Sequence, residues 1–285
     1  MPEGDTIQRI ADVMRRCLRD EVIVAARGRP GGAQVSRVVG SRVTAVAARG
    51  KHLLIDFEVG LTLHSHLQMR GTWHRYRPGE RWRRPVDRAV ALLETRSVVA
   101  VCFDAPTVEL LETRALRLHP VLSELGPDLL GSDCALDDAV RRLLASRLTI
   151  AEALLDQRIV AGIGNVYRNE VLFMAGQDPF AAAAKLSQER ATELLATAQL
   201  LLRANVRGGD RVTMPDASGA PPDASIAGSR QPGRWVYRRA GRPCRKCGSL
   251  ICSRSIGALP RRLYWCPGCQ PAEEPPDRDF PQRPG

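Results

Sequence analysis

The spacing of hydrophobic residues changes along the chain and divides it into regions of different expected structure. In residues 5–18 apolar side chains recur at a helical spacing, which predicts an amphipathic helix with one buried face. From residue 22 to residue 111, short apolar runs typical of β-strands take over. These runs cover residues 22–24, 43–46, 52–57, 61–67, 89–94, 98–103 and 107–111, with a hairpin turn at 58–60. One helix followed by many short strands predicts a helix-capped β-sandwich, which we assign to residues 1–118.

A helical period replaces the strand pattern after residue 118. We expect residues 119–131 to link two domains and residues 132–234 to form a helical domain that ends in a Gly- and Pro-rich loop at 205–234. The helices are predicted at residues 136–144, 150–159, 166–174 and 187–204. A glycine turn at 161–165 places Asn165 to cap the third of them. Two interpretations of this turn remain open. Its glycines could let the backbone approach a phosphate closely, or the turn could be an ordinary corner between two helices.

Four cysteines near the C-terminus have the spacing of a zinc site. Cys244 and Cys247 form one Cys-x2-Cys pair, and 18 residues separate it from the pair Cys266 and Cys269. Two such pairs complete a tetrahedron and leave no position for water, so we expect one structural Zn2+. The pattern predicts a zinc-finger β-ribbon over residues 235–270, starting with a short strand at 235–237 and followed by a disordered Pro-rich tail at 271–285.

The charge of the chain indicates a polyanionic partner. Lys and Arg number 42 against 31 Asp and Glu, which gives a net charge of +11 and a pI near 9.8. Nucleic acid and an acidic membrane surface both fit this excess. Neither a membrane-spanning run nor a signal-peptide core is evident, so we expect a cytoplasmic location without membrane association. The cysteines outside the two pairs are expected to be thiols.

The first residues carry a candidate nucleophile. If Met1 is removed, Pro2 presents a secondary amine, and Glu3 beside it can supply acid–base chemistry. An amine and a carboxyl group together can form an imine at an aldehyde-like carbon. Alternatively, Glu3 and Asp5 only begin and cap the first helix.

Several segments, in order along nearly the whole chain, resemble one family. They are MPEGDT (1–6), RGKHLL (49–54), HSHLQMRGTW (64–73), LLDQRIVAGIGNVYRNEVL (154–172) and YWCPGCQ (264–270). Together they resemble the formamidopyrimidine-DNA glycosylase/endonuclease VIII family of base-excision repair enzymes. The residues of these motifs are more similar to endonuclease VIII than to the purine-directed branch of the family. The resemblance implies an α+β multidomain fold with an N-terminal catalytic β-sandwich, a helix-two-turn-helix domain and a four-cysteine zinc finger.

The resemblance also implies a mechanism and its residues. The damaged nucleotide is flipped out of duplex DNA. Pro2 attacks C1′ of its sugar and leaves a Schiff base, Glu3 protonates the ring oxygen, and Lys51 binds phosphate and donates a proton in β-elimination. Arg261 matches the finger arginine of the family, so the resemblance implies that it binds phosphate and assists a second, δ, elimination.

Further positions that match the family's DNA contacts are Gln68, Met69, Arg70 and Asn165. Residues 68–70 would fill the gap left by the flipped base, for which an unbranched Met69 is suited, although a core methionine is the alternative. The chain departs from the family pattern in three places. The longer segment between the cysteine pairs lets Arg262 compete with Arg261. Glu124 stands where relatives often have an arginine, and Arg70 differs from the aromatic residue of some relatives.

The sequence therefore predicts a bifunctional DNA glycosylase/AP lyase that removes oxidised bases, with pyrimidines as the expected substrates. It would act as a monomer on duplex DNA, contain one zinc ion and associate with the nucleoid through DNA. A purine-directed enzyme acting on formamidopyrimidine or 8-oxoguanine is the alternative within the class. A non-catalytic DNA-binding zinc-finger protein is the alternative outside it.

Overall fold

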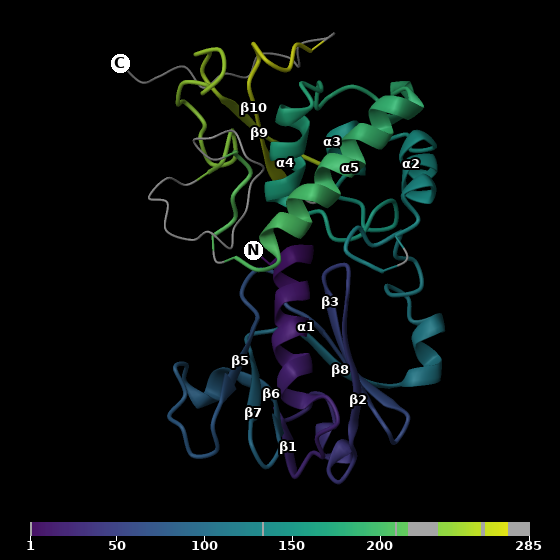
Figure 1. Cartoon of the computed structure of the whole chain (residues 1–285), viewed down its shortest axis with the longest axis vertical. Helices are drawn as coiled ribbons and strands as arrows, with labels where there is room; N and C mark the ends of the chain where they lie inside the picture. The colour runs from purple at the N-terminus through teal and green to yellow at the C-terminus, as the bar shows by residue number, and fades with distance from the viewer. Residues whose placement is uncertain (1, 133, 209, 216–232, 258–259, 273–285) are drawn as a thin grey trace. The chain divides into compact units, whose positions relative to one another are not determined.

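The computed structural model describes residues 2–132, 134–208, 210–215, 233–257 and 260–272. The chain divides into two compact units, Met1–Cys134 and Ala135–Gly285, and each is described by itself (Figure 1). Most of the predicted loop at 205–234 and most of the predicted tail at 271–285 lie outside the described residues.

The first unit contains one long helix and two four-stranded antiparallel sheets. Helix α1 (Gly4–Leu18) runs beside both sheets (Figure 1). One sheet has the order β2-β3-β4-β8, with β2 (Val43–Arg49), β3 (His52–Phe57), β4 (Leu61–His66) and β8 (Thr107–Glu112). The other has the order β1-β6-β7-β5, with β1 (Ala25–Gly28), β5 (Thr72–Tyr76), β6 (Ala89–Glu94) and β7 (Val99–Phe103). Short 3-10 helices occur at Val35–Val38, Val86–Arg88 and Thr113–Leu118.

A shared hydrophobic core explains this arrangement. The apolar face of α1 contributes Ile7, Ala11, Met14 and Leu18 to a core formed by side chains from both sheets. Each of the three larger side chains, Ile7, Met14 and Leu18, stabilises the fold by about 1.5–3 kcal/mol when it leaves water. This confirms the predicted helix-capped β-sandwich. The predicted strand at 22–24 is wrong, because Val22 makes only an isolated bridge to Arg42.

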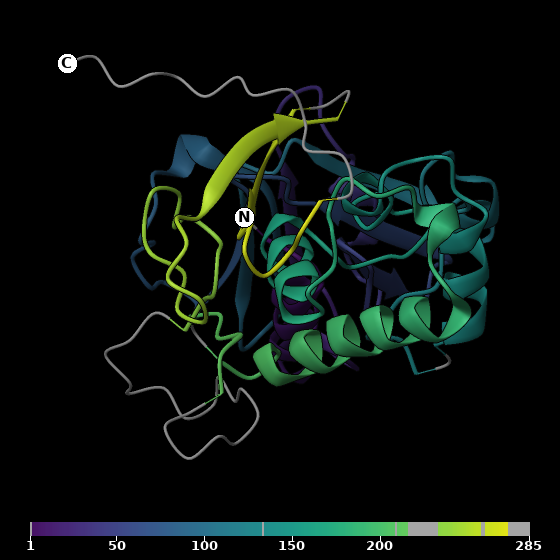
Figure 2. The ribbon, with the colours of Figure 1, turned by 90° about the horizontal axis from the view of Figure 1, so that it is seen from above.

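The second unit contains the helices and a two-stranded ribbon. Its helices are α2 (Leu136–Leu144), α3 (Ile150–Ala153), α4 (Asn165–Met174) and α5 (Gln188–Asn205), with a 3-10 helix at Ala183–Lys185. Helix α5 packs against α2 and α4 and is the long helix in Figure 2. Strands β9 (Cys252–Ile256) and β10 (Arg261–Trp265) form an antiparallel hairpin, and β10 packs against α4.

Three local predictions in this unit differ from the structure. Helix α3 begins with a Thr149–Glu152 capping box but ends at Ala153, whereas the pattern predicted a helix over 150–159. The backbone instead folds into a turn in which Asp156 accepts from the N–H groups of Ile159 and Val160. Residues 235–237 form no strand. Asn165 is the first residue of α4 rather than its cap, which is Gly164.

Candidate functional site

Pro2 and Glu3 lie at the start of α1. Pro2 is half-buried, whereas the Glu3 side chain is fully buried. The Glu3 backbone is extended, and its carbonyl accepts from the N–H groups of Thr6 at 3.0 Å and Ile7 at 3.1 Å. A carboxyl group at a helix N-terminus is favoured by the partial positive charge of the first turn. The helix therefore holds a sequestered carboxyl group one residue from Pro2.

Lys51 lies with Gly50 in the turn between β2 and β3. Gly50 adopts a positive φ of 58°, which glycine reaches without steric cost. Its N–H donates to Asp128 Oδ2 at 2.6 Å, and Asp128 Oδ1 accepts from the N–H of Leu130 at 3.0 Å. Asp128 belongs to the segment predicted as a linker, so this segment holds the turn that presents the half-buried Lys51.

Residues 67–71 form a tight turn that exposes the three central side chains. The N–H of Gly71 donates to the carbonyl of Leu67 at 2.9 Å, and Gln68 has a positive φ of 47°. Gln68 and Arg70 are exposed, and Met69 is 58% exposed. Met69 is therefore an apolar side chain that the fold directs toward solvent, which excludes the alternative that it belongs to the core.

Asn165 lies at the start of α4 against the ribbon. Its side chain is buried, and its Nδ2 donates to the carbonyl of Arg262 at 3.0 Å. The same carbonyl accepts from Arg168 Nη2 at 3.0 Å. Before α4, the side chain of Gln157 braces the glycine turn by accepting from the N–H of Gly162 at 3.1 Å. The first turn of α4 is therefore held against the ribbon, and Gln157 separately braces the glycine turn before it.

Arg261 and Arg262 are both exposed neighbours on β10 and point to opposite faces of the ribbon. Arg262 Nη1 donates to Ser253 Oγ at 3.3 Å. The Arg261 guanidinium makes no polar contact with the part of the chain that the structure describes. Glu124, which stands where relatives often have an arginine, is also exposed.

The four paired cysteines come together with metal-site geometry. The Sγ atoms of Cys244 and Cys269 are 3.8 Å apart, those of Cys247 and Cys266 are 3.3 Å apart, and all four lie within 4.8 Å of one another. Sulfurs that surround zinc tetrahedrally at about 2.3 Å are separated by about 3.8 Å. Hydrogen bonds from Ser249 lower the pKa of Cys247 to about 6, whereas burial raises the pKa of Cys266 to about 11. A dication offsets the cost of several adjacent thiolates, so this donor set could hold a metal such as zinc.

Helix α4 carries buried polar residues whose role the sequence pattern did not reveal. Arg168, Asn169 and Glu170 are fully buried. Glu170 accepts from the backbone N–H groups of residues 235, 236 and 237 at 2.7, 2.9 and 2.7 Å and from the Thr213 hydroxyl. The only sequence signal was a run of polar residues inside an otherwise apolar helix.

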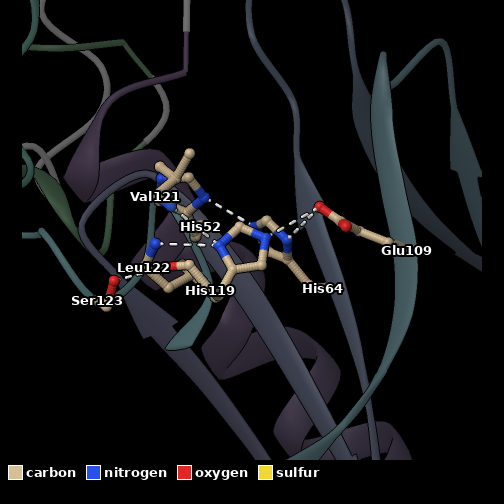
Figure 3. Close-up of polar contacts among 7 residues, drawn as sticks. All are labelled: His52, His64, Glu109, His119, Val121, Leu122 and Ser123. Carbon is tan, nitrogen blue, oxygen red and sulfur yellow. Dashed lines mark hydrogen bonds and ion pairs between the residues drawn. The ribbon is translucent and has the colours of Figure 1, made fainter. Parts of the chain in front are cut away.

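A cluster of histidines was also missed. His52, His64, His66 and His119 lie together beside Glu109 (Figure 3 labels all but His66). Burial, together with the positive charge of neighbouring imidazoles and Lys51, lowers the pKa of His52 to about 3. Burial and Lys51 lower that of His66 to about 4. The sequence signal for this cluster was the pair His64 and His66, which are two residues apart on one strand and therefore lie on the same face of the sheet.

Among the residues that the structure describes, no helix combines the length and apolar character that crossing a membrane requires.

Family models match most of the chain. The model of the formamidopyrimidine-DNA glycosylase N-terminal domain matches residues 1–106, and that of the formamidopyrimidine-DNA glycosylase H2TH domain matches residues 125–216. Among solved structures, a Lactococcus lactis Fpg in complex with DNA containing an abasic site has a TM-score of 0.77 at 21% identity, covering 95% of this chain and 100% of that chain. This structural likeness supports the fold.

Curated relatives are similar over nearly their full length. The chain is 37% identical to a probable endonuclease 8 2 of Streptomyces coelicolor, with 98% of both chains covered. It is 36% identical to a DNA-(apurinic or apyrimidinic site) lyase of Mycolicibacterium smegmatis, with 95% of this chain and 100% of the relative covered. With these matches, the chain belongs to the formamidopyrimidine-DNA glycosylase/endonuclease VIII family, and it is a DNA glycosylase/AP lyase of base-excision repair.

Proposed function

We propose that this enzyme removes oxidised pyrimidines from duplex DNA through a Schiff base on Pro2 and then nicks the strand by β,δ-elimination. The observation that carries the proposal is the fully buried Glu3 carboxyl group at the start of α1, next to Pro2. A carboxyl group in this position can supply the proton that opening of the sugar ring requires. Helix capping alone does not account for it, because the Glu3 side chain makes no capping hydrogen bond.

The reaction is proposed to start after removal of Met1. The Pro2 nitrogen forms a bond to C1′, and the glycosidic bond breaks with its electron pair going to the departing base. Glu3 gives a proton to the ring oxygen as the sugar opens to the Schiff base. Loss of a proton from C2′ then expels the 3′-phosphate, with Lys51 binding phosphate and donating a proton. A second elimination, assisted by Arg261, releases the 5′-phosphate.

The surrounding residues are proposed to hold the DNA. Exposed Met69 would enter the base stack where the damaged nucleotide leaves, with Gln68 and Arg70 beside it. Asn165 would bind a backbone phosphate from the start of α4. Of the two ribbon arginines, Arg261 is favoured for phosphate contact, because Arg262 donates to Ser253. We propose that the four cysteines bind one structural Zn2+, which stabilises the ribbon, and that the enzyme acts as a monomer.

Borohydride trapping tests the covalent step. The enzyme is incubated with duplex DNA that carries thymine glycol, 8-oxoguanine or an abasic site, and sodium borohydride reduces any Schiff base to a stable adduct. We expect adducts with thymine glycol and the abasic site, and none from Pro2→Gly or from enzyme that retains Met1. Preferential trapping on 8-oxoguanine would favour the purine-directed alternative. Absence of any adduct from the intact enzyme would contradict the proposed covalent mechanism.

A further inference from the structure

The histidine cluster occupies the outer face of the sheet β2-β3-β4-β8. Side chains alternate between the two faces of a strand, and the strand register places His52 opposite His66 and His64 opposite Glu109. His52 and His64 are only 5% and 1% exposed, and the His119 ring lies edge-on against that of His64 with centroids 5.3 Å apart. Nitrogens and carboxylate oxygens at such short separations form either a metal site or a chain of hydrogen bonds.

The hydrogen bonds of His119 distinguish a metal site from a chain of hydrogen bonds. Its Nδ1 accepts from the backbone N–H groups of Val121 at 3.2 Å and Leu122 at 3.1 Å (Figure 3). A neutral ring whose Nδ1 is an acceptor carries its proton on Nε2. The His119 Nε2–H therefore donates to Glu109 Oε1 at 3.4 Å.

A metal ion would require a different state of the same ring. His64 Nδ1, Glu109 Oε1 and His119 Nε2 are close enough to share an ion. A ligating neutral histidine must carry its proton on the nitrogen that does not bind the metal. In His119 that nitrogen faces two N–H donors and cannot hold a proton without losing both bonds. The three groups therefore form a hydrogen-bonded chain rather than a metal site.

The remaining protons in the chain follow from the Glu109 carboxylate. An ionised carboxylate only accepts hydrogen bonds, so His64 Nδ1, at 3.1 Å from Glu109 Oε1, carries the proton. His64 Nε2 is then an acceptor and receives the Nδ1–H of His52 at 2.8 Å. His52 Nε2 is left with a lone pair and makes no other hydrogen bond with the described residues. The chain of donors therefore ends in an unprotonated nitrogen on the residue that follows Lys51.

We propose that His52, His64 and Glu109 form a proton relay that opens at His52 and serves the elimination step beside Lys51. His52 Nε2 takes the proton that C2′ loses, and the electron pair of the C2′–H bond forms the new carbon–carbon double bond. The C3′–O bond breaks, and its electron pair leaves with the 3′-phosphate. His52 passes its Nδ1 proton to His64 Nε2. His52 stays neutral, and the positive charge comes to rest on His64 against the Glu109 carboxylate. His64 and Glu109 are positioning residues, because they act through His52.

The charges around the relay favour a positive charge on His64 over one on His52. His66 stacks on His52 with ring centroids 4.6 Å apart, and it and Lys51 both disfavour a charge on His52. His64 is also buried and faces His119, which lowers its pKa, but the hydrogen bond and the charge of Glu109 act in the opposite direction. A proton that enters at His52 is therefore held more favourably on His64. The elimination role rests on the proposed function, whereas the proton positions do not.

The kinetic test compares Glu109→Gln with Glu112→Gln, an exposed carboxyl group on the same strand that pairs with Arg114. Single-turnover cleavage of abasic-site duplex DNA is followed from about pH 4 to about pH 8, because burial lowers the pKa of His64 below the ordinary value of a histidine. We expect Glu109→Gln to lower the plateau rate at least about tenfold. Its acid limb should move to lower pH, because loss of the carboxylate makes His64 harder to protonate. The control should match the parent enzyme.

A uniform loss of rate with an unmoved acid limb, or a rate within about twofold of the control, would overturn the relay. Borohydride adduct formation should stay unchanged in Glu109→Gln, since the Schiff base forms before the relay acts. If the parent enzyme forms no adduct, the proposed function fails, and the relay is judged by a second measurement that is independent of activity.

That measurement is nitrogen NMR of the 15N-histidine-labelled enzyme. We expect the proton of His119 on Nε2 and those of His52 and His64 on Nδ1, with His64 protonated before His52 on acidification. A proton on Nδ1 of His119 would contradict the assignment. Zinc added to the labelled enzyme should leave these signals unchanged, and a shift of His64 and His119 together at one equivalent would establish a metal site instead.

Discussion

At the scale of single residues, the turn at residues 67–71 depends on Gly71 for its backbone conformation, whereas the Met69 side chain is exposed to solvent. A Cβ at Gly71 would lie 2.7 Å from the carbonyl oxygen of Leu67 and 2.8 Å from its Cα. Both neighbours are backbone atoms, so no side-chain rotation relieves the clash. The turn that exposes Met69 therefore depends on glycine at its end.

Two substitutions separate these roles. Gly71→Ala should destabilise the protein by about 1–3 kcal/mol, because the turn must shift to admit the methyl group. Met69→Ala should change stability by no more than about 0.5 kcal/mol, since its side chain is exposed. It should nevertheless slow base removal from duplex DNA more than from single strands, where no stack needs filling. Chemical denaturation and single-turnover cleavage measure the two effects, and equal slowing on both DNA forms would argue against insertion.

At the scale of secondary structure elements, α4 joins the parts of the second unit. Its buried Glu170 gathers the backbone N–H groups of residues 235–237, and Asn169 accepts from the N–H of Tyr264 on β10. Residues that form no strand of their own are thus held in place by one side chain. The segment that leads into the cysteine ribbon depends on this helix.

Glu170→Gln should destabilise the second unit by about 2–4 kcal/mol. The amide group has a single acceptor oxygen, so some of the backbone donors that Glu170 now satisfies would face an N–H2 group in a buried site. Glu193→Gln on α5 is the control, because Glu193 is exposed and pairs only with Arg190. Denaturation followed by tryptophan fluorescence compares the two variants, and similar midpoints would show that the Glu170 contacts add little.

Local patterns predicted the elements that have a regular period, including β3, β4, α2 and α5, and the spacing of Cys244, Cys247, Cys266 and Cys269 predicted their clustering. Contacts between distant positions could not be predicted in this way. His119 meets Glu109 only because the chain folds back over the sheet, and Glu170 finds its backbone N–H donors more than sixty residues later. The short α3 escaped prediction because the backbone turn at Asp156 interrupts a continuing apolar period.

At the scale of the whole molecule, a hydrophobic core lies within each of the two units, and the four-cysteine cluster belongs to the second. The core around the cluster is small and includes Cys244 and Cys266 themselves, together with Phe173, Val236 and Ile251. A core of this size contributes little stability alone, so a bound metal supplies much of the folding free energy of such a ribbon.

Cys247→Ser should therefore release the metal and weaken DNA binding while the first unit stays folded. The matched control is Cys252→Ser, a cysteine of the same ribbon that lies outside the cluster and whose thiol donates to the Leu250 carbonyl. Native mass spectrometry measures zinc per chain, fluorescence anisotropy measures affinity for abasic-site duplex DNA, and limited proteolysis reports whether the first unit persists. Cys252→Ser should retain one zinc and its affinity, since its sulfur is not a ligand. Full zinc content and unchanged affinity in Cys247→Ser would show that the ribbon does not depend on a metal held by these four cysteines.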